Sequence, residues 1–106
     1  MIKYEIRMTE GRHPVPVVVF EDRKYEMVGA FLLAEARSFP DEILHAIDAV
    51  CTDGEASGEF VGNAFRLEIA AEMTKVVDDI MGKECEICTK ELKGIAEAYC
   101  KAYRGG

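Results

Sequence analysis

The sequence has little of the material from which most catalytic sites are built. It contains only two histidines, too few for a facial metal site, and neither His13 nor His45 has a recognisable partner for general base catalysis. No serine or threonine lies in a nucleophile motif such as G-x-S-x-G, and the glycines form no phosphate-binding loop. These absences count against hydrolase and nucleotide-binding sites, and we expect no catalytic residues.

Long apolar runs and clusters of basic residues are also missing. The longest apolar run, residues 15–20, contains Pro16 and is far too short to span a membrane. The first residues, MIKYEIRMTEG, lack the apolar segment of a signal peptide, so we expect the chain in the cytoplasm. Beyond Arg23 and Lys24 no basic cluster exists, which disfavours nucleic-acid binding.

The composition is that of one ordinary globular domain. The chain has 106 residues, of which 49% are hydrophobic and 31% charged, so a single domain over residues 1–106 is expected. Its net charge is −7, from 13 Lys and Arg against 20 Asp and Glu. Such a charge repels nucleic acids and attracts basic surfaces, although it also serves simply to keep a protein soluble.

Alternating apolar and polar residues predict antiparallel strands across the central stretch, residues 58–88. Phe65, Leu67 and Ile69 alternate with polar neighbours, and the alternation continues from Thr74 in a shifted phase. A helix over residues 65–80 also fits the spacing of the apolar residues, with Asn63 as its N-cap. We favour strands because several of these residues are β-branched and a Gly-Asn turn precedes them.

Further strands are predicted at residues 1–8, 15–20 and 84–88. Pro16 cannot donate a ladder hydrogen bond, which places residues 15–20 at a sheet edge or a bulge. A short charged turn suggests that residues 15–20 form a hairpin with residues 25–30. Residues 31–37 fit either a helical turn or the end of that strand. The exposed edge of residues 15–20 could support strand pairing, so we expect a monomer or a homodimer.

Two helices follow from capping residues and apolar stripes. Ser38 is the expected N-cap of the first, which ends near Gly54. Thr89 is the expected N-cap of the second, which closes before Gly105-Gly106. The stripes consist of Ile43, Leu44, Ile47, Val50 and Cys51 in the first helix, and of Leu92, Ile95, Ala96, Tyr99 and Tyr103 in the second.

The order strands, helix, strands, helix predicts an α+β fold. No βαβ alternation is present, so the sheet should be antiparallel. We expect one sheet of about five to six strands with the two helices packed on one face.

The four cysteines raise the possibility of a zinc or thiol site. Cys85-x-x-Cys88 has the spacing of a zinc half-site, which Cys51 and Cys100 could complete. However, residues three apart on a strand point to opposite faces, and a thiol in a helix stripe packs as a small apolar group. A redox motif would need its first cysteine at a helix N-terminus, where this sequence has Thr89. We therefore expect no metal and no cofactor.

Carboxylate pairs are the remaining polar feature. Asp78-Asp79 and Glu84 with Glu86 flank one turn; such runs usually form a solvated face. They could also mate with a basic cleft, since acidic inhibitors of basic enzymes gain association rate and specificity from such surfaces.

The second half of the chain resembles small bacterial immunity proteins, which neutralise polymorphic toxins, including those of contact-dependent growth inhibition. The resemblance lies in GEFVGNAFRLEIAAEMTKVVDDI followed by CEICTKELKGIAEAYCKAY, with Gly62-Asn63 before a strand, Thr74-x-Val76-x-Asp78, and Ile87-x-Thr89-x-Glu91-Leu92. Tyr99 departs from the pattern, which has a tryptophan in that helix. The resemblance implies a non-enzymatic inhibitor of one cognate toxin domain and carries over no binding residue.

The favoured hypothesis is therefore an acidic, immunity-type inhibitor that binds a basic toxin domain such as a nuclease. The expected partner-binding residues form a first group, Asp78, Asp79, Glu84 and Glu86, and a second group, Asp41, Asp48 and Glu55. The alternative is a small regulatory module that depends on zinc or thiols and is built on the four cysteines. An enzyme that uses His13 or His45 is a third possibility.

Overall fold

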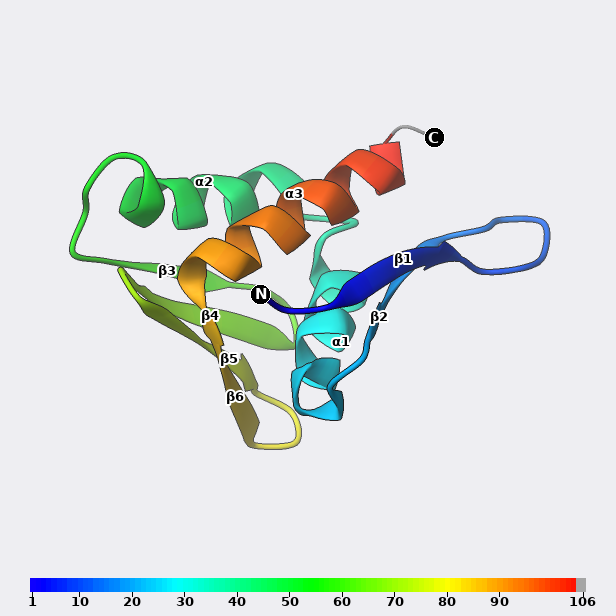
Figure 1. Cartoon of the computed structure of the whole chain (residues 1–106), viewed down its shortest axis with the longest axis horizontal. Coiled ribbons are helices and arrows are strands. Elements are labelled where there is room, and N and C mark those ends of the chain that lie inside the picture. Colours follow the sequence, from blue (N-terminus) through cyan, green and yellow to red (C-terminus); the bar gives the residue numbers. More distant parts are fainter. Residues whose placement is uncertain (105–106) are drawn as a thin grey trace.

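The computed structural model describes residues 1–104, which form two antiparallel sheets and three α-helices (Figure 1). The predicted α+β class is confirmed. The predicted single sheet with two helices is wrong, because the strands divide into a pair and a set of four, and a third helix lies between them. The elements are β1 (Tyr4–Met8), β2 (Pro16–Phe20), the 3-10 helix η1 (Arg23–Tyr25), α1 (Glu26–Glu35), α2 (Pro40–Cys51), β3 (Ser57–Val61), β4 (Phe65–Ala70), β5 (Met73–Asp78), β6 (Lys83–Cys88) and α3 (Thr89–Arg104).

The four-stranded sheet has the order β3-β4-β5-β6, with every neighbouring pair antiparallel. The strand prediction for residues 65–80 is thus confirmed, and the helical alternative is wrong. Residues that point to the inner side of the sheet, such as Leu67 on β4 and Val76 on β5, are fully buried. Glu68, which follows Leu67 and points to the other side, is exposed. The tight turn at Ala71-Glu72 accounts for the shift of phase between the two halves of the stretch.

The predicted hairpin of residues 15–20 with residues 25–30 is wrong. Strand β2 pairs with β1 instead, from Tyr4 opposite Phe20 to Met8 opposite Pro16. Residues 25–35 are helical because their buried side chains, Val28, Phe31, Leu32 and Glu35, recur at helical spacing. A reading at period two over residues 25–30 misses that spacing.

Helix α2 begins at Pro40 and buries the predicted stripe through Ile43, Ile47 and Val50. The N-cap is Phe39 rather than Ser38, and it supplies no side-chain hydrogen bond. The ring of Phe39 instead packs against that of Phe60, with centroids 5.7 Å apart. Burial of an aromatic residue at this boundary has displaced the polar cap that the sequence suggested.

Helix α3 begins at Thr89 as predicted, but the Thr89 hydroxyl does not cap its first turn. The hydroxyl donates to the Ala70 carbonyl at 2.7 Å and lies 2.8 Å from the Thr74 hydroxyl. The fully buried Thr89 therefore ties the start of the helix to β4 and β5. The predicted end of this helix at Gly105-Gly106 lies outside the described residues.

The three α-helices lie on one side of the four-stranded sheet (Figure 1). One core joins the inward side chains of the sheet, among them Leu67, Val76 and Ile87, to the helices and to β2. The opposite face of the sheet carries no helix within residues 1–104. No helix in that range has the length and apolar character that crossing a bilayer requires.

Candidate protein-binding face

The uncovered side of the four-stranded sheet is the most distinctive surface of the molecule, and we call it the open face. Strand pairing places Glu59 opposite Glu68, Glu68 opposite Lys75, and Lys75 opposite Glu86, so one charged row crosses all four strands. A second row runs parallel to it through Val61, Arg66, Val77 and Glu84. The open face thus consists of Glu59, Val61, Arg66, Glu68, Lys75, Val77, Glu84 and Glu86.

Carboxylates outnumber cations on the open face. Lys75 Nζ lies 3.8 Å from a Glu84 carboxylate oxygen and faces Glu86 across the strands. Among residues 1–104, no ion pair involves Glu59 or Glu86. This surface therefore keeps acidic groups that a basic partner could neutralise.

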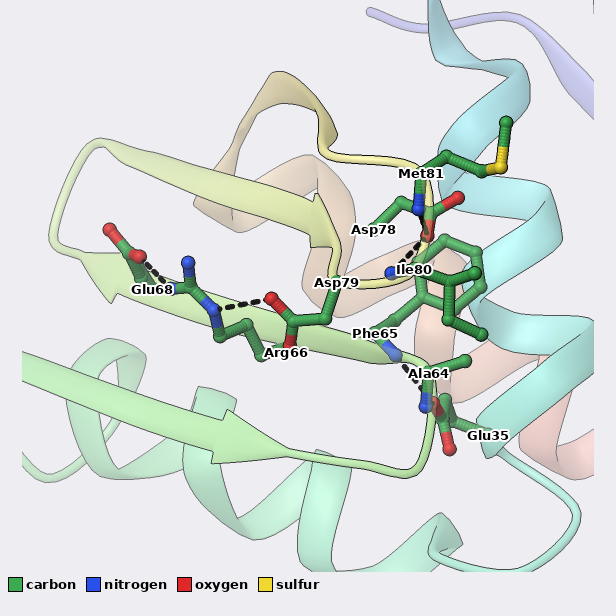
Figure 2. A network of polar contacts seen from close by, with 9 residues as sticks. All are labelled: Glu35, Ala64, Phe65, Arg66, Glu68, Asp78, Asp79, Ile80 and Met81. Atoms are coloured by element: carbon green, nitrogen blue, oxygen red, sulfur yellow. Dashed lines mark hydrogen bonds and ion pairs between the residues drawn. The ribbon is translucent and has the colours of Figure 1, made fainter.

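Arg66 is the other cation of the open face and is held by two carboxylates (Figure 2). Its guanidinium donates to Asp79, with Nε 3.0 Å from Oδ1, and to Glu68. These side-chain hydrogen bonds, the one to Asp79 first, raise the pKa of Arg66. Two carboxylates sharing one guanidinium leave a net negative charge at this end of the sheet.

Apolar groups lie among these charges. Val77 is only 6% exposed although it belongs to the open face, and Arg66 stands directly opposite it. The arginine stem can cover such a side chain while its charged head stays in water. Val61 and Met73, both largely exposed, add apolar surface beside the charged row. A protein interface combines an apolar centre with a polar rim, and the open face offers groups of both kinds.

The first predicted group is only partly brought together by the structure. Glu84 and Glu86 lie on the open face, and Asp79 borders it through Arg66. Asp78 has a different role, because its carboxylate accepts the main-chain N–H groups of Ile80 and Met81, each at 2.9 Å (Figure 2). Its side chain shapes the β5–β6 turn.

The second predicted group lies elsewhere, on α2 and the loop that follows it. Asp48 accepts a hydrogen bond from Lys93 Nζ at 2.7 Å, and Asp41 pairs with Arg104, so both carboxylates are neutralised by α3. Glu55 is exposed in the loop before β3. Helix α2 covers the inner side of the sheet, so this group and the open face belong to different surfaces.

The turn at one end of the open face is held by Glu35, a residue that belongs to no motif in the sequence. This side chain is fully buried, and its carboxylate accepts the N–H group of Asn63 at 3.0 Å. It also accepts the N–H groups of Ala64 and Phe65, each at 2.7 Å (Figure 2). A Cβ atom at Gly62 would lie 2.4 Å from Glu35 Cδ, so any other residue there would have to displace the carboxylate or the turn. The helical spacing from Val28 to Glu35 is the one signal that could have revealed this carboxylate.

The cysteines and histidines do not converge. Cys85 packs against the core while Cys88 is exposed, and burial raises the pKa values of the Cys85 and Cys100 thiols. Within the described part of the chain, no group of three or more His, Cys, Asp or Glu side chains could hold a metal ion. His13 lies in the exposed loop between β1 and β2, and His45 lies on the exposed side of α2.

No family model matches this sequence, and no curated protein or solved structure matches it either.

Proposed function

We propose that this protein is a non-enzymatic, immunity-type inhibitor that acts in the cytoplasm by binding a basic toxin domain. The observation that carries the proposal is the open face, where Glu59, Glu68 and Glu86 line one row on the side of the sheet that no helix of residues 1–104 covers. The resemblance of residues 58–103 to immunity proteins supports the same function.

The open face suits recognition of a basic surface for two physical reasons. Its carboxylates stand on paired strands, so binding would cost little backbone ordering. Its negative charge, within a molecule of net charge −7, accelerates encounter with a basic domain and disfavours acidic ones. Of the predicted residues, the proposal retains Asp79, Glu84 and Glu86 as partner-binding and leaves Asp78 to the turn.

The test is protection of growth, with the toxin domain encoded beside the gene as the probe. Wild-type protein co-expressed with that domain should restore growth. The open-face variant Glu59→Lys, Glu84→Lys, Glu86→Lys should lose protection, because it reverses charges that a basic surface would contact. A toxin-free culture and a thermal melt would check that the variant is expressed and folded.

A matched variant on the second group separates the two surfaces. Asp41→Lys, Asp48→Lys, Glu55→Lys changes the net charge by the same amount but leaves the open face intact, so it should still protect. We call this second-group variant the α2 variant. If the α2 variant loses protection and the open-face variant keeps it, the assignment of the interface is wrong. A neighbouring gene for a metabolic enzyme, with no toxin domain nearby, would count against the function itself.

A further inference from the structure

The β1–β2 hairpin lies apart from the open face and has one unpaired edge. In the described residues β1 pairs only with β2, and the loop between them reaches past the helices (Figure 1). Two main-chain hydrogen bonds fix the direction of the main-chain groups: Glu21 N–H donates to Lys3 O at 3.1 Å, and Thr9 N–H donates to Val15 O at 2.9 Å. Hydrogen-bonded and non-hydrogen-bonded residue pairs alternate along two antiparallel strands, so the main-chain groups of Glu5 and Arg7 also form hydrogen bonds with β2. The N–H and C=O groups of Tyr4, Ile6 and Met8 must then point away from it.

The outer edge of β2, by contrast, is covered. The main chain of Gly29 in α1 approaches Val18 O so closely that a Cβ there would lie 3.1 Å away. The carbonyl of Pro16 accepts the Tyr99 hydroxyl at 2.9 Å, and Pro16 has no N–H to offer. The edge expected at residues 15–20 is therefore closed, and the free edge of this sheet belongs to β1.

The side chains of β1 are complementary to a second copy of the same strand. If two copies pair antiparallel about Ile6, the exposed Glu5 of each faces the exposed Arg7 of the other, while Tyr4 faces Met8. The main-chain groups of Tyr4, Ile6 and Met8 are the ones that this register joins. The same operation about Cys85 on edge strand β6 would set Glu84 against Glu86, which is repulsive.

One other antiparallel register would also place opposite charges together. With the two-fold axis at Tyr4, Lys3 of each copy would face Glu5 of the other. That register needs the main chain of Ile2, whose N–H already donates to Glu91 in α3 at 3.3 Å. Within residues 1–104, no hydrogen bond of this kind involves the outward main-chain groups of Tyr4, Ile6 or Met8. Met8, at 52% exposure, leaves apolar surface for a partner there.

We propose that this protein forms a two-fold homodimer through β1, in which the two hairpins join into one antiparallel sheet with the order β2-β1-β1-β2. Each Glu5 pairs with Arg7 of the other copy, exchanging the ion pair that Glu5 and Arg7 make within one chain. A second copy is the partner that fits the edge of β1, because in the antiparallel orientation the charges of the strand are opposite to those of its own copy. The open face belongs to the other sheet and stays available, so the dimer does not depend on the proposed function.

Charge exchange tests the register directly. Sedimentation equilibrium of the full chain, from about 1 μM to about 1 mM, should show a reversible dimer. Glu5→Arg alone, or Arg7→Glu alone, should weaken dimerisation about tenfold or more, because each places like charges opposite each other at both symmetry-related positions. An equimolar mixture of these two variants should restore association, since each strand then meets one of opposite charge.

Matched controls lie in the hairpin loop. Glu10→Arg and Arg12→Glu make the same charge changes on exposed residues outside the paired segment and should leave the dimer unchanged. Circular dichroism would confirm that every variant is folded. A wild-type chain that stays monomeric at about 1 mM overturns the proposal. So does a dimer that neither single reversal weakens, or a mixture of the two variants that fails to associate.

Discussion

At the scale of residues, one buried carboxylate connects the helical layer to the open face. Glu35 sits in α1, yet its three hydrogen bonds all go to the main chain of residues 63–65. Buried carboxylates need such partners, because an unpaired charge in the interior is strongly unfavourable. Glu35 thereby fixes the turn from which β4, with Arg66 and Glu68, begins.

Glu35→Gln should destabilise the fold markedly. The amide group of glutamine would turn an N–H₂ donor toward at least one main-chain donor and would remove the charge that strengthens the hydrogen bonds that remain. We expect the free energy of unfolding to fall by about 2–4 kcal/mol. Urea denaturation measures the change. Glu55→Gln, the same substitution at an exposed position, should change stability by less than about 0.5 kcal/mol. Equal effects at both positions would contradict the role given to Glu35.

Gly62→Ala should be destabilising through the same carboxylate. Its Cβ would meet Glu35 Cδ at 2.4 Å, which requires the carboxylate or the turn to move. We expect a loss of about 1–3 kcal/mol, because inserted atoms in a filled site force shifts of this cost. In a Glu35→Ala background the space is open, so the double-mutant cycle should show strong non-additivity. Additive effects would mean that the two residues do not interact.

Tyr99 provides a pH-dependent contribution to stability. Burial raises the pKa of Tyr99 to about 12, whereas an unfolded chain has a tyrosine pKa of about 10. The folded state therefore holds the phenolic proton more tightly, and the stabilisation is complete below about pH 10 and lost as the pH rises toward 12. Urea unfolding across this range should show a steeper decline for wild type than for Tyr99→Phe. Parallel pH profiles would show that Tyr99 titrates alike in both states.

At the scale of elements, sequence periodicity predicts the structure from residue 40 onward better than that of residues 21–39. Strands β4, β5 and β6 and helices α2 and α3 have clear periods of 2 or 3.6 with turn residues between them. Helix α1 is apolar almost all round, and its first turns contain alternations that mimic a strand. Its helical identity depends on burial against β2 and the sheet, which is tertiary information.

The candidate site divides in the same way. Sequence alone finds Glu84 and Glu86, because alternation on β6 puts both on one face. It cannot reveal Glu59 and Glu68 as their neighbours, since that follows from the registers of β3 with β4 and β4 with β5. Nor can the sequence distinguish the roles of Asp78 and Asp79. The hydrogen bonds of the turn hold the carboxylate of Asp78, whereas that of Asp79 reaches Arg66 on the open face.

Strand β6 also determines how the cysteines should react. Cys88 is exposed, whereas Cys85 and Cys100 are shielded and burial raises their thiol pKa values. At pH 8 under native conditions, we expect a thiol reagent to modify Cys88 much faster than Cys85 and Cys100, because the thiolate is the reactive form. Mass spectrometry of partly labelled protein gives the order. Rapid modification of Cys85 would mean that β6 does not have this register or packing.

At the scale of the whole molecule, the layers separate the surfaces by role. The helices cover one side of the four-stranded sheet and leave the acidic open face on the other, while the β1–β2 hairpin presents a separate edge (Figure 1). In α2 and α3, carboxylates such as Asp48 are paired with lysine or arginine across the helices. On the open face, Glu59 and Glu86 have no such partner within the described residues, so this surface could accept a basic partner.

Association kinetics test this assignment most directly. For the basic toxin domain that the proposed function requires, the rate constant of binding would be measured by stopped flow at low and physiological salt. We expect wild type and the α2 variant to associate at similar rates that fall as salt rises. The open-face variant Glu59→Lys, Glu84→Lys, Glu86→Lys should associate roughly tenfold or more slowly at low salt. Equal rates for the open-face variant and wild type would contradict the assignment of the open face as the binding surface.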